Sequence, residues 1–385
     1  MTSTEFLPFA VPDIGEAEIG AVVEAMRSGW LTTGPNAAAF EAEFARVIGE
    51  GTHCIAVNSA TAGLHLALDA IGIGPGDEVL VPTWTFTSTA EVVRYVGADP
   101  VFVDVDKDSL NIDLRHASAR VTPRTRAIMP VHFAGRAVDR GQLAAFAKAH
   151  DLAVIEDAAH AFPVRSQGRM VGSGDSDAVV FSFYATKTIT TGEGGMIAIA
   201  DPDRARRIRA MRLHGISRDV FDRYRSTKPS WEYEVIAPGF KYNLTDTAAA
   251  MGRVQLARAD QMRDRRQHIA ASYSDAFSDL PVDLPVGPLP GDTHGWHLYV
   301  LRLQDDAGLS RNEFIQRMAE LGVGCSVHFI PLHRQPYWRD RYHLLDNEFP
   351  VASSEFERCV SLPAFSSMTT EQIDRVISAV QKCLR

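Results

Sequence analysis

The sequence predicts an α/β protein, with a large, mostly parallel sheet covered by helices on both faces and a smaller α+β domain after it. First, short apolar runs alternate with helical patterns up to about residue 255, as in parallel sheets that are buried on both faces. Second, this alternation then stops, and strands and helices mix. Third, 385 residues, 45% of them hydrophobic, suffice for two or three domains with a sizeable core. We therefore place a large domain at 1–255 and a small domain at 256–385.

The elements follow from the periodicity of the apolar residues. Helical spacing predicts the helices, and short apolar runs predict the strands of a seven-stranded α/β/α domain. In the large domain the predicted helices are 16–26, 37–48, 61–71 and 142–150, and the predicted strands are 54–57, 78–81, 100–104, 127–131, 153–157, 178–182 and 195–199. Next come a helix at 254–272, a Pro/Gly-rich stretch at 281–290, a strand at 296–303, a helix at 311–321, a strand at 324–329 and a helix at 370–384.

Composition excludes several classes of protein. The formal net charge of -9 argues against sequence-independent binding to nucleic acid. The four cysteines lack CxxC spacing, so we expect free thiols in a reducing compartment and no metal cluster. No secretory signal and no membrane-spanning apolar run is visible, so we expect a cytoplasmic protein. Arginines gather at 204–212 and at 263–266, where we expect solvated helix faces rather than a binding patch.

The most informative stretch places Lys187 between an apolar strand and a glycine-rich turn, Gly192-Glu-Gly-Gly195, that leads into the next strand. A lysine at the edge of a sheet can be partly desolvated, which lowers the pKa of its amine and frees it to form a Schiff base. The glycines allow the backbone to turn sharply and to approach a planar ligand closely. A surface lysine beside a hairpin fits this segment equally well when the segment is taken alone.

Asp157 ends the predicted strand 153–157, at the carboxyl edge where parallel sheets bind ligands. A buried carboxylate needs a cationic partner, because an unpaired buried charge is costly. The protonated pyridine nitrogen of pyridoxal phosphate (PLP) is such a partner, and the pairing makes the ring an electron sink. The alternative is an aspartate that caps the next helix, but the presence of Lys187 favours the cofactor.

Two further segments fall at the same edge of the predicted sheet. Ser59, Ala60 and Thr61 lie between a strand and a helix start, where backbone N–H groups bind anions, although simple helix capping also fits. Trp84 and Phe86 follow another strand, and either could stack on a flat ring, although core packing is the usual fate of such residues. The four segments together supply an amine, a carboxylate, an anion site and an aromatic face, and this combination is much more specific than any one of them.

These motifs resemble those of the DegT-type sugar aminotransferases, which are PLP-dependent enzymes of fold type I, and the resemblance runs over nearly the whole chain. It implies a fold type I architecture and transfer of an amino group to a keto-sugar. Besides Lys187 and its glycine-rich turn, the resemblance rests on Ser28-Gly-Trp-Leu-Thr-Thr-Gly-Pro35, Asn58-Ser-Ala-Thr-Ala62, Pro130-Val-His-Phe-Ala-Gly135, Glu156-Asp-Ala-Ala-His160 and Val327-His-Phe329.

The resemblance implies a role for each matching position. Lys187 would be the Schiff-base lysine and would move the proton between the donor's α-carbon and the cofactor, and Asp157 would pair with the pyridine nitrogen. Thr33 and His328 would face the sugar nucleotide. The other implied cofactor residues are Ser59, Ala60, Thr61 and Ser182 at the phosphate, Phe86 against the ring and His160 near the ring hydroxyl.

One loop departs from the family pattern. Many members have Gly-Tyr-Asn-Tyr-Arg where this chain has Gly239-Phe-Lys-Tyr-Asn243, and that loop usually reaches the PLP phosphate of the partner subunit. Either Lys241 or Asn243 would therefore make the contact. The resemblance thus implies a homodimer in which the two subunits share their active sites.

Within the family, the resemblance is closest to members that aminate C4 of UDP- or dTDP-linked keto-sugars. The expected reaction moves the amino group of L-glutamate to the C4 keto group of a nucleotide-linked 6-deoxy keto-sugar, giving an amino-sugar nucleotide and 2-oxoglutarate. Amination at C3 and a PLP-binding regulator without turnover are the alternatives. A PLP-dependent sugar dehydratase is disfavoured, because such proteins carry histidine at the position of Lys187.

Overall fold

A seven-stranded sheet lies at the centre of the computed structural model, which describes residues 6–216 and 233–385. All seven strands predicted for the large domain belong to this sheet. Among its described strands only β9 runs antiparallel to its neighbours, so the sheet is mostly parallel, as predicted. Side by side, the strands are β1 (His53–Val57), β9 (Gly195–Ile199), β8 (Ala178–Ser182), β5 (Ala153–Asp157), β4 (Thr125–Ile128), β2 (Glu78–Pro82) and β3 (Asp99–Val103).

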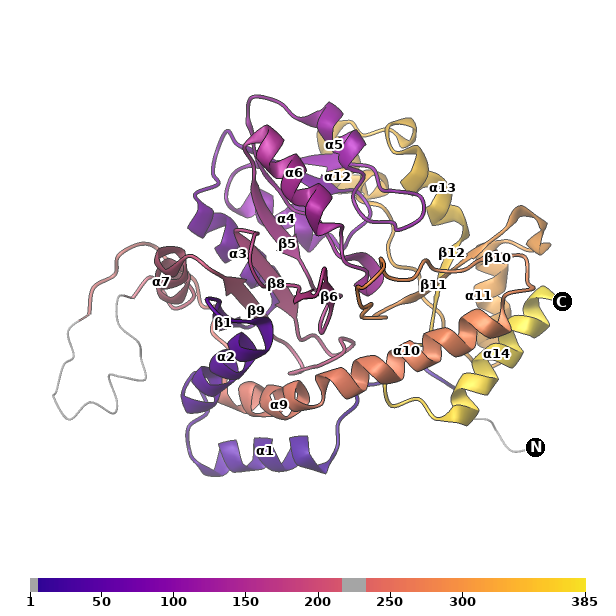
Figure 1. Cartoon of the computed structure of the whole chain (residues 1–385), viewed down its shortest axis with the longest axis horizontal. Helices are drawn as coiled ribbons and strands as arrows, with labels where there is room; N and C mark the ends of the chain where they lie inside the picture. Colours follow the sequence, from indigo (N-terminus) through magenta and orange to yellow (C-terminus); the bar gives the residue numbers. More distant parts are fainter. Residues whose placement is uncertain (1–5, 217–232) are drawn as a thin grey trace.

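Both faces of this sheet are covered by helices, as Figure 1 shows. Alternate residues of a strand point to opposite faces, and each set needs its own apolar cover. In β1, Ile55 and Val57 belong to the hydrophobic cluster that includes helix α3, whereas Cys54 and Ala56 belong to the cluster that includes α2. The helices of this part are α1 (Glu16–Arg27), α2 (Pro35–Ile48), α3 (Ala60–Ile71), α4 (Ser88–Tyr95), α5 (Leu114–Arg120), α6 (Arg140–His150), α7 (Pro202–Met211) and α9 (Asp246–Ala257).

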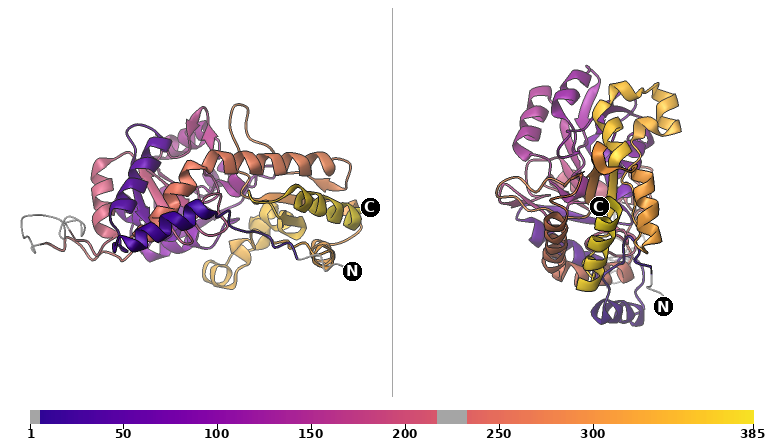
Figure 2. Two further views of the ribbon diagram at one scale, coloured as in Figure 1. Left: turned by 90° about the horizontal axis from the view of Figure 1, so that it is seen from below. Right: turned by 90° about the vertical axis from the view of Figure 1, so that its right-hand side faces the viewer.

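The C-terminal part is built on a three-stranded antiparallel sheet. Figure 1 shows α10, α11 and α14 around this sheet, and in the left-hand view of Figure 2 the long α10 extends toward it from the large sheet. The division at 255/256 stays a prediction. The elements of this part are β10 (Val282–Asp283), β11 (Tyr299–Leu303) and β12 (Cys359–Leu362), with α10 (Ala259–Ala276), α11 (Arg311–Glu320), α12 (Pro336–Tyr342), α13 (Pro350–Arg358) and α14 (Thr370–Leu384).

The predicted strand at 324–329 is wrong. The structure has a single backbone bridge here, between Ser326 and Ser361. The chain then leaves the sheet, and the His328 carbonyl accepts a hydrogen bond of 2.9 Å from the indole of Trp84. The strand that pairs with β11 here is β12, and no strand was predicted from the sequence at its position. At the end of this segment, His328 and Phe329 line a cavity instead of joining a sheet.

The predicted helix at 254–272 is two helices. The first, α9, begins at Asp246, and the helical backbone is interrupted at Arg258 before α10 begins. The guanidinium of Arg258 turns toward the N-terminal segment, where it pairs with Asp13 at 2.8 Å and with Glu18 at 2.7 Å. This tertiary contact lies more than 230 residues away in the sequence, so helical periodicity could not reveal the break.

The arginine groups are not wholly solvated, which corrects a further expectation. Arg212 is buried, where it forms an ion pair with Glu41 and donates to the carbonyl of Ala56 at 2.7 Å. Arg266 of α10 is also buried. Both guanidinium groups bind backbone carbonyls, which is how a buried cation avoids an unsatisfied donor.

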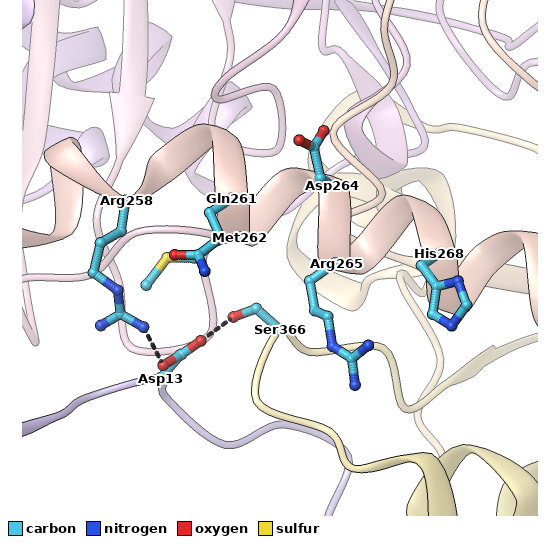
Figure 3. Close-up of a pocket in the computed structure, with 8 residues that line it drawn as sticks. All are labelled: Asp13, Arg258, Gln261, Met262, Asp264, Arg265, His268 and Ser366. Carbon is cyan, nitrogen blue, oxygen red and sulfur yellow. Dashed lines mark hydrogen bonds and ion pairs between the residues drawn. The ribbon is translucent and has the colours of Figure 1, made fainter.

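An N-terminal arm, residues 6–13, links the two parts of the molecule. Its Leu7 exchanges backbone hydrogen bonds with Gly322 and Gly324. Figure 3 shows the end of the arm, where the carboxylate of Asp13 accepts from Arg258 of the helix break and from Ser366 of a C-terminal loop, each at 2.8 Å. The arm therefore bridges the start of α10 and the C-terminal loop.

Asp246 caps a helix from outside that helix. It is fully buried, and its carboxylate accepts from the backbone N–H groups of Gly34 at 2.7 Å and of Asn36 and Ala37 at 3.0 Å each, at the start of α2. The cap position itself is Gly34, which has no side chain to accept these hydrogen bonds.

We expect Asp246→Ala to lower the free energy of unfolding by about 3 kcal/mol or more, because three backbone donors, two of them buried, lose a charged acceptor. Urea titration followed by circular dichroism measures this change. The matched control is Asp264→Ala, at a largely exposed aspartate of α10, where we expect a change within about 0.5 kcal/mol. Equal losses in the two variants would contradict the capping role.

Candidate active site

A cavity of about 520 Å³ opens at the carboxyl edge of the large sheet. It gathers residues that follow β1, β2, β5 and β8, together with residues from the C-terminal part. This convergence was predicted from the positions of the four motifs at strand ends. The predicted residues that line the cavity are Ser59, Ala60, Thr61, Phe86, Asp157, His160, Ser182, Lys187 and His328.

Lys187 lies in the connection between β8 and β9, and its amine faces the cavity. Burial lowers the pKa of this amine to about 8, a shift that Asp157 opposes and that Arg266 reinforces. An amine with such a pKa is partly neutral near physiological pH, so it can act as a nucleophile and take up a proton. The reading of Lys187 as a plain surface lysine does not fit this position.

Asp157 is the last residue of β5 and is buried. Its carboxylate accepts from the backbone N–H of Ala159 at 3.1 Å and from the hydroxyl of Thr89 at 2.9 Å. Because the Thr89 hydrogen is used in this way, Thr85, whose hydroxyl lies 2.8 Å from that of Thr89, must be the donor in that pair. The pKa of Asp157 is raised, because burial outweighs these hydrogen bonds and the charge of Lys187.

The helix-cap alternative for Asp157 fails. The next helix of the described chain after β5 is α7, which begins at Pro202. Within the described residues, Asp157 has no salt-bridge partner within 4 Å, so its charge is available to a cationic ligand group. A buried carboxylate of this kind suits a protonated pyridine nitrogen.

The start of α3 provides an anion site. Ser59 caps the helix by accepting from the N–H of Ala62 at 3.1 Å, and the N–H groups of Ala60 and Thr61 form no hydrogen bond to the described backbone or side chains. Gly195 of β9 lies against this helix start, since a Cβ there would come within 2.9 Å of the Ala60 nitrogen. The approach of β9 to the anion site therefore requires glycine.

The two aromatic residues near the sheet edge have different surroundings. Trp84 is completely buried, with its indole N–H bonded to the His328 carbonyl. Phe86 is 57% exposed in the single chain and lines the cavity, with its ring centroid 5.9 Å from that of Phe329. Of the two, Phe86 is the one whose ring is accessible to a ligand.

Three predicted residues lie outside the cavity lining of the single chain: Thr33, Lys241 and Asn243. Asn243 donates to the Thr33 hydroxyl at 2.8 Å, and that hydroxyl donates to the carbonyl of Leu244 at 2.6 Å. Lys241 is exposed, and its ammonium has no hydrogen-bond or ion-pair partner in the part of the chain that the structure describes. The Asn243 side chain thus holds the loop to Thr33, whereas the Lys241 ammonium makes no such contact within the described residues.

Histidines make up much of the cavity wall, and His297 among them was not predicted. Burial and the charge of Lys187 hold the pKa of His160 and of His297 well below 6.5, and they lower the pKa of His328 to about 4. All three rings are therefore neutral at physiological pH. Among the described residues that line the cavity, Lys187 is the only lysine or arginine, so the single chain offers little positive charge to an anionic ligand.

Several other residues of the site were also missed, among them Thr89, Tyr184 and Glu193. The only signal for His297 was its position, a polar residue inside the apolar run Trp296-His-Leu-Tyr299. Thr89 is the second residue of α4 and gave no signal, because its contact with Asp157 spans 68 residues.

The chain is similar to known proteins over its whole length. The profile described as the DegT/DnrJ/EryC1/StrS aminotransferase family matches residues 12–381. A spore coat polysaccharide biosynthesis protein of Bacillus subtilis is 46% identical over 382 residues, which are 99% of this chain and 97% of that protein.

Two solved structures are similar in fold. A Streptococcus pneumoniae protein in its PLP form has a TM-score of 0.89 at 32% identity, covering 99% of this chain and 100% of that one. An aminotransferase of Helicobacter pylori that is involved in the biosynthesis of pseudoaminic acid has a TM-score of 0.89 at 26% identity, covering 99% of each chain.

Proposed function

Because the chain belongs to the DegT/DnrJ/EryC1/StrS aminotransferase family, we propose that it transfers the amino group of L-glutamate to the C4 keto group of a nucleotide-linked 6-deoxy keto-sugar. The predicted family and fold type I architecture are confirmed. The proposed products are an amino-sugar nucleotide and 2-oxoglutarate, and the proposed cofactor is PLP. The observation that carries the proposal is the convergence of Lys187, Asp157 and the start of α3 on one cavity.

The residues present fit PLP. Asp157 offers a buried carboxylate without a salt-bridge partner among the described residues, and the start of α3 offers free N–H groups for a phosphate. The Nδ1 atom of His160 is buried and has no hydrogen-bond partner in the described chain, so it is available to the ring hydroxyl. The remaining proposed contacts are Ser59, Ala60, Thr61 and Ser182 at the phosphate and Phe86 on the ring face.

When bound, PLP supplies an aldehyde for attachment of an amine and a ring that delocalises electrons. The protein's own groups would divide the remaining work. Asp157 would keep the pyridine nitrogen protonated, because its charge would otherwise lie buried and unpaired. Lys187, neutral in part at physiological pH, would take the proton from the α-carbon of glutamate in the first half-reaction. In the second half-reaction it would deliver a proton to the sugar carbon that receives the amino group. The neutral histidines would not compete for that proton.

The C4 position and the nucleotide carrier rest on the resemblance to family members that aminate C4 of nucleotide-linked sugars. His328 supports a polar substrate at the inner wall, because its ring faces the cavity beside Phe9 and its Nδ1 atom is held 3.0 Å from the Ser361 hydroxyl. Amination at C3 uses the same groups and remains the nearest alternative. The joint presence of Lys187, Asp157 and Ser59 at one cavity argues against a regulator without turnover.

The proposal is tested with a panel of UDP-, dTDP- and GDP-linked 4-keto and 3-keto sugars, each incubated with L-glutamate and the purified protein. Products are identified by mass spectrometry and NMR. Formation of 2-oxoglutarate with a 4-amino sugar supports the proposal. A 3-amino product would replace it with the C3 alternative, and a protein that binds PLP but aminates no sugar would support the regulator.

A homodimer with shared sites is part of the proposal. Among the described residues that line the cavity of one chain, Lys187 is the single cationic side chain, yet the proposed ligands carry several phosphate or carboxylate groups. Lys241 is exposed, and its ammonium has no hydrogen-bond or ion-pair partner within the described residues, whereas the Asn243 side chain donates to Thr33. We therefore propose that Lys241 reaches the phosphate in the partner's cavity. A cytoplasmic setting completes the proposal, supported by four unpaired cysteines.

Shared sites predict complementation between two inactive subunits. One subunit carries Lys187→Ala, and the other carries Lys241→Ala together with Asn243→Ala. In the mixed dimer one site receives both lesions, while the other receives a native lysine and a native loop. We expect activity to return to about half of the wild-type sites per heterodimer, because a two-fold interface makes the two sites complementary. Amino transfer after subunit exchange is the measurement.

The control is the loop variant alone, which must be clearly impaired. If it is impaired and the heterodimers are as inactive as their parents, the loop serves its own subunit and the shared-site proposal fails. The single Lys241→Ala and Asn243→Ala variants assign the contact. A loss in the first that the second does not reproduce supports Lys241.

A further inference from the structure

His297 enters the active-site cavity from the C-terminal part of the chain. Its side chain is 7% exposed, and its Nε2 atom lies 3.4 Å from the Nζ atom of Lys187. The ring also packs on His160, with centroids 4.3 Å apart. A contact of 3.4 Å is long for a hydrogen bond, but such bonds often shorten once the ligands of a site are bound.

The backbone before His297 is strained. Trp296 has a φ of 45°, which a bulky residue adopts only when its surroundings enforce it. Here the backbone N–H of Trp296 donates to His294 at 2.8 Å, and its indole donates to Gln267 of α10 at 2.7 Å. On either side, Gly295 and Leu298 donate to the backbone carbonyls of Gly135 and Ala134 in the turn after β4. These contacts on both sides of Trp296 hold its strained backbone in place and so fix the direction of the His297 side chain.

Arg266 of α10 binds the backbone of the same segment. Its buried guanidinium donates to the carbonyls of Trp296 at 3.3 Å and His297 at 3.4 Å, and also to that of Ala364. Within the described residues no carboxylate lies within 4 Å of this guanidinium. The cation therefore binds the backbone that carries His297, and its charge acts on Lys187.

Packing alone does not explain a histidine at this position. The Nδ1 atom of His297 is buried and has no hydrogen-bond partner among the described residues. An unsatisfied buried polar atom is unfavourable, and an apolar side chain of similar size would pack on His160 without that cost. Among the described residues, the polar contact that the His297 ring does make is the one with Lys187.

We propose that His297 is a positioning residue for Lys187: its Nε2 atom accepts a hydrogen bond from the Lys187 amine whenever that amine is not covalently bound. A neutral amine has two hydrogens and one lone pair. When one hydrogen is directed to His297, the lone pair can point into the cavity, where a proton is to be taken up. The inference rests on the proposed function only in taking Lys187 as the reactive amine.

Charge in the cavity agrees with an accepting role. The groups that face the lysine are Asp157, His160, His297 and His328, with Arg266 behind them. The pKa of His297 lies well below 6.5, mainly because the ring is buried and also because of Lys187 and the neighbouring histidines and Arg266. The ring is therefore neutral and does not take the proton itself. An acceptor stabilises the ammonium form of Lys187, and removing it should lower the lysine pKa.

The test measures Lys187 itself rather than turnover. The full-length protein is saturated with pyridoxamine phosphate, the cofactor form that leaves the lysine amine free, and is labelled with acetic anhydride over a pH series. Peptide mass spectrometry then gives the acetylated fraction of Lys187. For the wild type we expect the midpoint near the lysine pKa of about 8. For His297→Leu we expect it to fall by about one to two pH units, because a hydrogen bond to a charged group is lost.

Two comparisons separate this role from a structural one. His297→Gln keeps a polar atom within reach of Lys187 and should hold the wild-type midpoint, whereas the shorter His297→Asn should not. His328→Leu changes another histidine of the same wall, one that is bonded to Ser361, and should shift the midpoint less than His297→Leu does. Equal midpoints for the wild type and His297→Leu, or for the glutamine and asparagine variants, would overturn the proposal. A failure of the proposed function would show separately, as absent cofactor binding or absent amino transfer.

Discussion

Replacing Lys187 with alanine is expected to lower the rate of amino transfer by at least about 10³-fold, because the variant loses both the proposed nucleophile and the proposed proton-transfer group. Lys187 is the only lysine or arginine among the described residues that line the cavity, so no neighbour can take over either task. The fold should persist, since the amine makes no contact that holds secondary structure together. Single-turnover rates, measured with L-glutamate for the first half-reaction and with the keto-sugar for the second, give the size of the loss.

The matched control is Lys148→Ala, at an exposed lysine of α6, which should keep wild-type rates. Borohydride reduction of the wild-type protein should remove its yellow colour and add the mass of the cofactor at Lys187 only. Small primary amines added to the alanine variant should restore part of the rate, an effect that a purely structural lysine would not give. Near-normal turnover of the alanine variant, or a cofactor mass on another lysine, would refute the assignment.

Asp157→Asn is expected to lower turnover by at least about 10²-fold, because the pyridine nitrogen loses the charge that stabilises its protonated form. The amide has nearly the size of the carboxylate, and its oxygen can still accept from Ala159. The thermal unfolding midpoint should therefore change little, which separates a chemical effect from a loss of structure. The pH dependence of the bound cofactor's absorbance gives an independent measure of the ring's protonation.

Thr89→Val serves as the control for the surroundings of this carboxylate. It removes one hydrogen bond to Asp157 and keeps the charge, so we expect a much smaller loss than in Asp157→Asn. Wild-type rates in Asp157→Asn would show that the charge of Asp157 is not needed and that its side chain only accepts the hydrogen bond from Ala159. Losses of equal size in both variants would show that geometry, and not charge, is what the site requires.

The parts of the structure that were predicted from sequence depend on local patterns. The seven strands were predicted because each is a short apolar run bounded by helical or turn segments. The cavity was predicted because residues that follow parallel strands meet at one edge of the sheet. Lys187 and Asp157 needed no knowledge of the tertiary structure beyond that rule. The first strand shows the limit, since its apolar run indicates burial but not that its neighbour in the sheet, β9, lies about 140 residues away.

The parts that were missed depend on tertiary contacts. The segment at 324–329 was predicted as a strand, but after one backbone bridge its His328 carbonyl accepts a hydrogen bond from the Trp84 indole. Arg266 was expected on a solvated face, yet the carbonyls it binds come from segments about 30 and 98 residues away. His297 reaches the cavity because Trp296 is forced into an unusual backbone conformation, and no residue pattern announces such strain.

The N-terminal arm limits how this protein can be recombined with its relatives. Phe9 of the arm lines the cavity and lies with its ring centroid 5.1 Å from that of His328, while Leu7 pairs with Gly322 and Gly324 and Asp13 bonds to a C-terminal loop. The wall that would face the sugar is thus assembled from both ends of the chain. A chimera that exchanges only the C-terminal part to alter sugar preference would place the His328 side of the cavity from a relative against the N-terminal arm of this protein. Crossover designs for this fold should therefore exchange residues 6–13 together with the C-terminal part, as one non-contiguous block.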